Sequence, residues 1–230
     1  VIGSVSPPGG DLSEPVTRHT QSIVRAFWAL SKPLADARHY PAIDWDQSFS
    51  DYAEKITDWW TNRFRDHWTA TRRDMLRLLC ESEQMLETTA FWSSLRRGAL
   101  GLLRQADELK QIASIIGPAA LSDRQQWTFY AANLVKEGFL QQNALDPVDA
   151  YCTAEKQLLL FTLLMEVYRR GCQLIEQSIP CSALLKLPSL RRLKRARTEI
   201  PNDQLHLLEQ LGDDIRAELA AVGQNEFSEA

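Results

Sequence analysis

Two prolines and two glycines stand side by side at residues 7–10, inside the segment 4–16 near the start of the chain, and no other segment constrains the fold as strongly. Proline fixes one backbone angle and glycine permits conformations closed to other residues, so this run predicts a stiff, tight loop. Ser13 is the expected N-cap of the helix that follows, with Pro15 in its first turn, where a missing N–H costs nothing. Because the chain starts with Val1 and enters this loop at once, we expect it to be part of something longer.

The composition is that of a globular chain without obvious nucleic-acid or membrane character. The 230 residues are 44% hydrophobic and 24% charged, enough for one large domain or two small ones. A net charge of −4 argues against nucleic acid as a main partner. The longest apolar run, residues 158–165, is too short to cross a bilayer, so any membrane association is expected to be indirect, through partners.

The four cysteines are scattered without the C-x-x-C spacing of metal and redox sites. They are Cys80, Cys152, Cys172 and Cys181. This spacing indicates reduced structural thiols in a cytoplasmic protein rather than a metal or disulfide set, and the four histidines share no ligand spacing either. The sequence therefore predicts no metal ligands.

Residues 1–45 combine short extended pieces with one helix. Apolar residues from Val16 to Leu30 recur near a period of 3.6, which predicts a helix that stops at residues 32–33. Residues 39–41 should be extended, because a residue before proline avoids the α region. A piece this small cannot bury both faces of its strands, so some of its apolar side chains should remain exposed.

From residue 46 onward, helical patterns dominate up to residue 222, and residues 223–230 should form a frayed polar tail. We expect Ser122 to cap one helix, and the longest buried helix to cover residues 149–177. Another helix opens at residues 187–188, and the last begins near residue 202. The predicted fold class is mainly α, an all-helical bundle domain preceded by a short α/β segment.

Six ordered motifs resemble the catalytic A subunit of V-type and A-type rotary ATPases. They are S-P-P-G-G-D-L-S-E-P-V at 6–16, I-V-R-A-F-W-A-L at 23–30, R-H-Y-P-A-I-D-W at 38–45, G-P-A-A-L at 117–121, F-L-Q-Q-N-A at 139–144 and D-A-Y-C at 149–152. From about residue 190 the match is looser. The resemblance implies that residues 1–45 are the end of a P-loop nucleotide-binding α/β domain and that residues 46–222 form the helical C-terminal domain.

Residues 71–111 depart from the family pattern and look longer than their usual counterpart, which implies an extra or extended helix at residues 74–97. Its role is either packing on the bundle or a lineage-specific contact with a neighbouring subunit. Residues 191–197 are rich in Arg and Lys, and this run is either a solvated face or a docking site on the rotor or a neighbour.

The resemblance implies hydrolysis or synthesis of ATP, coupled by a rotating shaft to transport of protons or sodium ions. It implies ATP or ADP with Mg²⁺ as cofactors, and as partners B subunits in an alternating ring, a central rotor shaft and a peripheral stator. The intact complex would be cytoplasmic and peripheral to a membrane. Because no G-x-x-x-x-G-K-[ST] phosphate loop occurs here, the phosphate and Mg²⁺ contacts should lie outside this chain. We assign no catalytic residue, and we expect the chain alone to be inactive.

Tyr40 is the first candidate for a nucleotide contact, since the family places an aromatic ring at this position against adenine. A ring next to a proline is a good stacking platform for a base. The alternative is that Tyr40 is a core residue of a hinge between the two domains, expected near residues 42–45.

The second candidate set lies in residues 139–151. The resemblance implies that Phe139, Gln141, Gln142, Asn143 and Tyr151 complete the adenine pocket. Amide side chains supply donors and acceptors for the edge of a base, and an aromatic ring can close the pocket. The alternative is a polar loop that caps the C-terminus of a helix.

A different class of function remains open beside that of an enzyme. A truncated or split gene product could be a stand-alone interaction module that binds rotor or stator subunits without ATPase activity. An adenine pocket would be superfluous in such a module, and this favours the enzyme.

Overall fold

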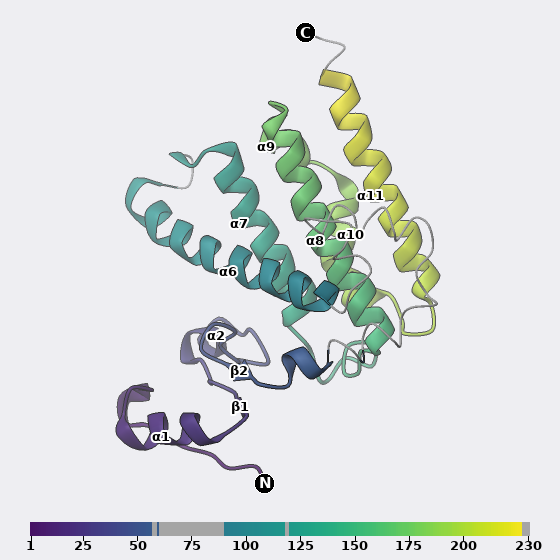
Figure 1. Ribbon diagram of the computed structural model, residues 1–230. Coiled ribbons are helices and arrows are strands. Elements are labelled where there is room, and N and C mark those ends of the chain that lie inside the picture. Colours follow the sequence, from purple (N-terminus) through teal and green to yellow (C-terminus); the bar gives the residue numbers. More distant parts are fainter. Residues whose placement is uncertain (57–58, 60–89, 118–119, 227–230) are drawn as a thin grey trace.

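The computed structural model describes residues 1–56, 59, 90–117 and 120–226. It confirms the predicted mainly helical fold class. Long helices pack into a bundle, and the short elements of the N-terminal part lie beside one end of it (Figure 1).

The N-terminal part contains two short strands among short helices. Its elements are η1 (Pro8–Gly10), α1 (Pro15–Ile23), β1 (Ala26–Phe27), α2 (Lys32–Asp36) and β2 (Phe49–Ser50). The strands are antiparallel, with Ala26 opposite Ser50 and Phe27 opposite Phe49. This pairing joins segments on both sides of residue 45, where the sequence suggests the end of the first domain.

The cap of α1 differs from the predicted one. Glu14, not Ser13, is the N-cap, and its carboxylate accepts hydrogen bonds from the backbone N–H groups of Val16 (3.0 Å) and Thr17 (2.9 Å). Ser13 instead donates its N–H and hydroxyl to Asp11, at 2.9 and 2.6 Å. These hydrogen bonds favour the charged carboxylates and lower the pKa of Asp11 and of Glu14.

The expectation that this helix reaches Leu30 is wrong. It ends at Ile23, and the chain turns into β1 and then into a bridge between Leu30 and Ile43. The apolar residues after Ile23 fit a helical period by coincidence, because partners far along the chain draw them into extended structure. As expected for so small a piece, Trp28 and Leu30 are 73% and 83% exposed.

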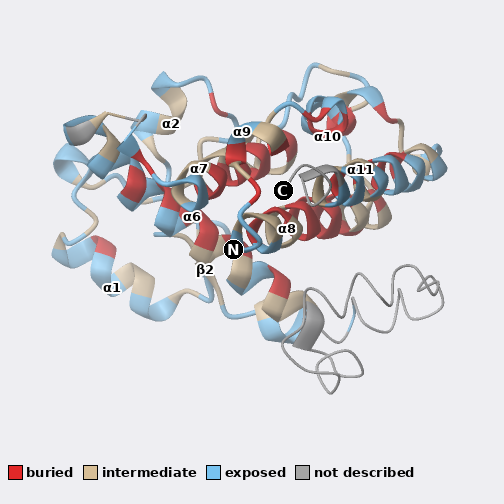
Figure 2. Ribbon diagram, turned by 90° about the horizontal axis from the view of Figure 1, so that it is seen from above, coloured by how far each residue is buried: buried red, intermediate tan, exposed pale blue. Residues whose placement is uncertain are grey.

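The bundle consists of six helices and one π-helical turn in the described part of the chain. They are α6 (Ala90–Ile116), α7 (Asp123–Val135), η4 (Lys136–Leu140), α8 (Ala154–Glu176), α9 (Cys181–Leu184), α10 (Pro188–Glu199) and α11 (Leu205–Glu226). The predicted Ser122 cap is confirmed as a capping box with Gln125. Figure 2 shows that buried residues concentrate on α8 and on the helix faces turned toward it, whereas α1 is mostly exposed.

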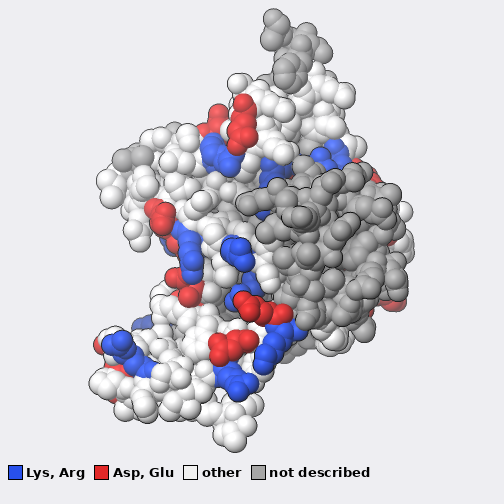
Figure 3. Space-filling view, viewed as in Figure 1, with Lys and Arg blue, Asp and Glu red and all other residues white. Residues whose placement is uncertain are grey.

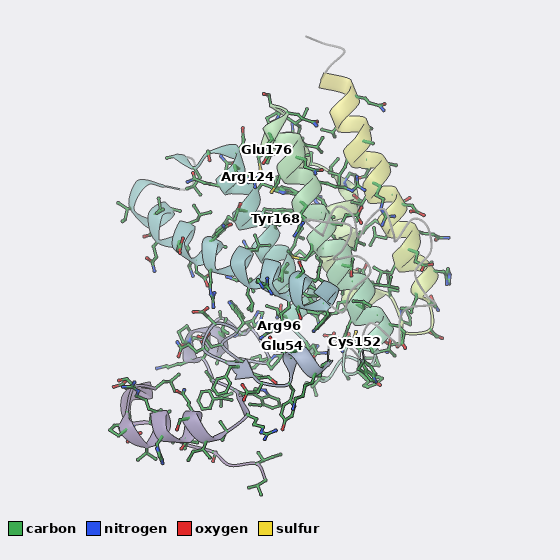
Figure 4. All side chains as sticks on the ribbon, viewed as in Figure 1. Glu54, Arg96, Arg124, Cys152, Tyr168 and Glu176 are labelled. Carbon is green, nitrogen blue, oxygen red and sulfur yellow. The ribbon has the colours of Figure 1, made fainter. Side chains whose placement is uncertain are left out.

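Helix α8 forms the centre of the core, and α7 packs closely against it. The fully buried Trp127 of α7 donates its indole N–H to the carbonyl of Tyr168 at 2.9 Å. A Cβ at Gly171 would lie 2.1 Å from the Trp127 ring, so this glycine makes the close approach possible. At the far end of the same pair, Arg124 and Glu176 form an exposed ion pair at 2.7 Å (Figure 4).

The ends of two helices differ from expectation. Helix α8 starts at Ala154 after a Thr153 cap, not at residue 149, because Asp149 is held in the preceding loop. Helix α11 extends to Glu226, into the predicted tail, and residues 227–230 lie outside the described residues. Of residues 74–97, only 90–97 are described, as the start of α6. The described cysteines, Cys152, Cys172 and Cys181, are free thiols.

Candidate functional site

A pocket of about 660 Å³ lies where the N-terminal part meets the loop after η4. Small-molecule sites commonly have this size. Two segments line it: Arg38, Tyr40 and Pro41 from the first, and Gln141, Gln142, Asn143, Ala144, Leu145, Asp149 and Ala150 from the second. The structure thus brings four of the six predicted site residues to one pocket.

Hydrogen bonds to the main chain join the two segments. The backbone N–H of Gln142 donates to the carbonyl of Tyr40 at 2.6 Å. The side-chain amide of Gln141 donates to the carbonyl of Arg38 at 3.4 Å, across 103 positions of sequence. The two walls of the pocket are therefore held in a fixed register.

Tyr40 lines the pocket and is 53% exposed, which is unusual for a core residue. Its hydroxyl makes a long hydrogen bond, 3.5 Å to the carbonyl of Ala35. A ring so weakly tied and half exposed offers a face to a flat ligand.

The π-helical turn η4 decides which residues reach the pocket. It inserts one extra residue per turn at the end of α7, and π turns of this kind often occur at functional sites. Phe139, within the turn, stacks on Phe161 of α8 with ring centroids 4.6 Å apart. Phe139 therefore packs against the core and does not line the pocket, while Gln141, Gln142 and Asn143 do.

The loop after the turn is held by its own polar side chains. The Asp146 carboxylate accepts from the N–H groups of Val148 (2.8 Å) and Asp149 (3.0 Å), and the Asn143 side chain accepts from Leu145 at 3.0 Å. Leu145 is 94% exposed although it lines the pocket. The loop thus places an apolar side chain at the pocket mouth.

Tyr151 lies just beyond this loop and outside the lining that the described residues form. Its side chain is 71% exposed, and its carbonyl accepts from the Asn202 side chain at 2.8 Å. The structure does not bring Tyr151 to the other predicted site residues.

Arg38, Asp149 and Arg197 belong to this region, although the sequence, which places them in two family motifs and a basic run, did not mark them as site residues. Arg38 and Asp149 line the pocket, and Asp149 forms a buried ion pair with Arg197 of α10. The pairing of Asp149 with Arg197 spans 48 positions and leaves no local signal.

Charged and aromatic groups also connect the N-terminal part to the bundle. The Lys136 ammonium lies 5.2 Å from the centre of the Trp45 ring and binds Asp107 at 2.9 Å. His39 meets Trp45 edge-on, and burial together with the charges of Lys136 and Arg197 lowers the pKa of His39. Lys, Arg, Asp and Glu side chains gather along this junction on the face seen in Figure 3.

The lining of the pocket combines an aromatic ring and amides with two charged side chains, Arg38 and Asp149. One wall offers a ring for stacking and the other offers amides that both donate and accept. Within the described residues, no group of three or more His, Cys, Asp or Glu side chains could hold a metal ion. Among the described helices, none combines the length and apolar character needed to cross a bilayer.

Comparison with known proteins identifies the relatives of both parts of the chain. Residues 1–50 match the nucleotide-binding domain of the ATP synthase alpha/beta family, and residues 86–185 match the C-terminal domain of V and A type ATP synthase. The V-type ATP synthase alpha chain of Nitrosococcus oceani is 44% identical over all 230 residues, which cover 35% of that protein. The A subunit of the A-type ATP synthase of Ignicoccus hospitalis is 36% identical over 92% of this chain and 32% of its own length.

The V-type ATP synthase alpha chain of Halothermothrix orenii shows the same relationship, with 36% identity over 92% of this chain and 32% of its own length. The chain thus spans about a third of the relatives that it matches. The family resemblance carried by the six motifs is confirmed. The chain belongs to the family of V-type and A-type ATP synthase alpha (A) subunits and matches their C-terminal region.

Proposed function

We propose that the pocket binds the adenine base of ATP or ADP, with the base stacked on Tyr40 and its edge read by Gln141, Gln142 and Asn143. The observation that carries this proposal is that Tyr40 and residues 141–143 line one pocket although about a hundred positions separate them. Adenine has a donating amino group beside accepting ring nitrogens, and amide side chains match both kinds of group. Stacking of a base on an aromatic ring contributes about 1–3 kcal/mol.

In this proposal Phe139 and Tyr151 do not line the pocket but lie next to the residues that do. Phe139 anchors the π-helical turn on Phe161 and so sets the direction in which Gln141 leaves the turn. Tyr151 follows the loop directly and could close on a bound base only if its exposed ring turned toward Leu145.

In the longer protein, the chain would be the C-terminal part of the catalytic A subunit of a rotary ATPase. That machine would hydrolyse or synthesise ATP while moving protons or sodium ions, with B subunits, a rotor shaft and a stator as partners. The phosphates and Mg²⁺ would be held outside this chain, which alone would be inactive. Residues 1–45 would complete the nucleotide-binding domain, and residues 46–222 would form a lever that contacts the rotor. The intact complex would be cytoplasmic and peripheral to the membrane.

A titration of the 230-residue chain with adenosine, followed by saturation-transfer NMR of the nucleoside, tests the pocket. We expect saturable binding in the millimolar range, kept by Tyr40→Phe and lost in Tyr40→Ala. Tyr52→Ala is the matched control, because Tyr52 is an exposed tyrosine outside the pocket lining. Absence of saturable binding to the unmodified chain, or equal loss in Tyr52→Ala, would contradict the proposal.

A further inference from the structure

The carboxylate of Asp149 closes the loop that forms the second wall of the pocket. One oxygen, Oδ2, accepts from the backbone N–H of Asn143 at 2.5 Å and also pairs with the guanidinium of Arg197. Asn143 and Asp149 thus fasten the two ends of the loop to each other, and Arg197 fastens that closure to α10.

Helix α10 is itself firmly held in the bundle. The Arg197 carbonyl accepts from the ammonium of the fully buried Lys156, at 2.7 Å. Burial lowers the pKa of Lys156, so its hydrogen bond to Arg197 stabilises an otherwise costly group. Arg197 therefore connects the pocket loop to a fixed part of the core.

The same helix also supports the start of the pocket segment. Lys194 binds Glu137 at 2.5 Å, and a Cβ at Gly138 would lie 3.7 Å from the Lys194 carbonyl oxygen, so η4 packs closely on α10. Both ends of the segment that carries Gln141, Gln142 and Asn143 thus rest on α10.

The Asp149–Arg197 pair is incompletely satisfied, unlike a second buried pair in the bundle. Asp149 Oδ1 and Arg197 Nε are buried without a hydrogen-bond partner among the described residues. Both oxygens of the buried Glu166 are occupied by Arg216, at 3.0 and 3.1 Å, and Arg170 adds a third bond. Leaving a buried polar atom unpaired costs about 1–3 kcal/mol. Because two of its buried atoms lack partners, the Asp149–Arg197 pair is a poor means of stabilising the fold, and its place beside the pocket suggests another role.

We infer that Asp149 and Arg197 are positioning residues for the base-binding pocket. Their ion pair holds residues 143–150 against α10 and so keeps Asn143 and the preceding glutamines opposite Tyr40. Neither residue need touch the base for this role, which rests on the proposed adenine site. A movement of α10 would therefore shift the pocket loop through the ion pair of Arg197 with Asp149.

The test compares two broken ion pairs in the full 230-residue chain. Arg197→Met breaks the ion pair with Asp149 beside the pocket, and Arg216→Met breaks the buried ion pair with Glu166. Glu166 lies about 18 Å along α8 from the start of that helix, at a rise of about 1.5 Å per residue, and so away from the pocket loop. Hydrogen exchange measured by mass spectrometry should show amides of residues 143–150 exchanging about tenfold faster in Arg197→Met, and unchanged in Arg216→Met. Equal exchange of that segment in both variants would overturn the inference.

Adenosine affinity supplies the second readout. We expect it to fall about tenfold in Arg197→Met, a loss of about 1.4 kcal/mol, and to stay constant in Arg216→Met. If Arg197→Met fails to fold, Asp149→Asn replaces it, since it keeps an acceptor for Asn143 but removes the charge that Arg197 binds. If the unmodified chain binds no adenosine, the adenine proposal fails, while the exchange result still decides whether the pair positions the loop.

Discussion

The backbone N–H of Gln142 donates to the carbonyl oxygen of Tyr40 at 2.6 Å, and this bond joins the two walls of the pocket. Because the main chain makes it, substitution of either side chain leaves it in place. A variant at Tyr40 therefore tests what the ring does and not whether the walls meet.

Tyr40→Ala should lower the free energy of unfolding by about 1 kcal/mol or less, because the ring is half exposed and weakly hydrogen-bonded. Urea denaturation followed by circular dichroism measures this. A loss of several kcal/mol would instead support the interpretation of Tyr40 as a hinge core residue.

Gly171→Ala should destabilise the bundle by about 3 kcal/mol, because the new methyl would overlap the buried Trp127 ring. Gly138→Ala is the control: its methyl would meet Leu164 and the Lys194 carbonyl at ordinary contact distance, 3.7 Å. Thermal denaturation of both variants separates the two cases. If Gly171→Ala and Gly138→Ala have the same melting temperature, α7 packs less closely on α8 than the contact of Gly171 with Trp127 implies.

Cys181 should make stability fall at alkaline pH. Burial, aided by the charge of Asp123, raises the pKa of its thiol from 9.0 to about 11. Below pH 9 the thiol is protonated in both states and its contribution is fully present. Above pH 9 the unfolded chain releases the proton first, so that contribution is lost as the pH rises toward 11.

The measurement is the free energy of unfolding in urea at pH 8 and at pH 10. The difference between the unmodified chain and Cys181→Ala should shrink by about 1 kcal/mol over this interval. A difference that stays constant would show that the thiol of Cys181 ionises equally in both states.

ATP should bind the chain no more tightly than adenosine does, in the millimolar range. Millimolar affinity corresponds to about −4.1 kcal/mol, which stacking and a few amide contacts can supply without phosphate contacts. Isothermal titration with ATP measures this, and a micromolar dissociation constant would contradict the assignment of the phosphate contacts to other parts of the protein.

The sequence predicted features that depend on local chemistry or on the family motifs. The Ser122 cap is local, and the helical character of the bundle follows from its apolar periodicity. The end of α1 was not predicted because β1 is a strand only through its pairing with residues 49–50, and no sequence pattern near β1 indicates that pairing. The long-range contact of Asp149 with Arg197 was invisible for the same reason.

The orientation of Phe139 was beyond prediction for a different reason. The π-helical turn adds a residue to the last turn of α7, which shifts every later side chain around the helix axis. The resemblance placed Phe139 with the pocket residues, but the family motif carries no sign of the π-helical turn. The motif identified the pocket segment, but the turn decides which of its side chains face the pocket.

Photoaffinity labelling with 2-azido-ATP, followed by peptide mapping, tests the central claim most directly, because covalent capture reports weak complexes by position. We predict that the label attaches to Tyr40 and to peptides containing residues 141–145, that excess adenosine suppresses it, and that Tyr52 stays unlabelled. Label spread over exposed aromatic residues such as Trp28, or unaffected by adenosine, would contradict an adenine site between Tyr40 and the loop after η4.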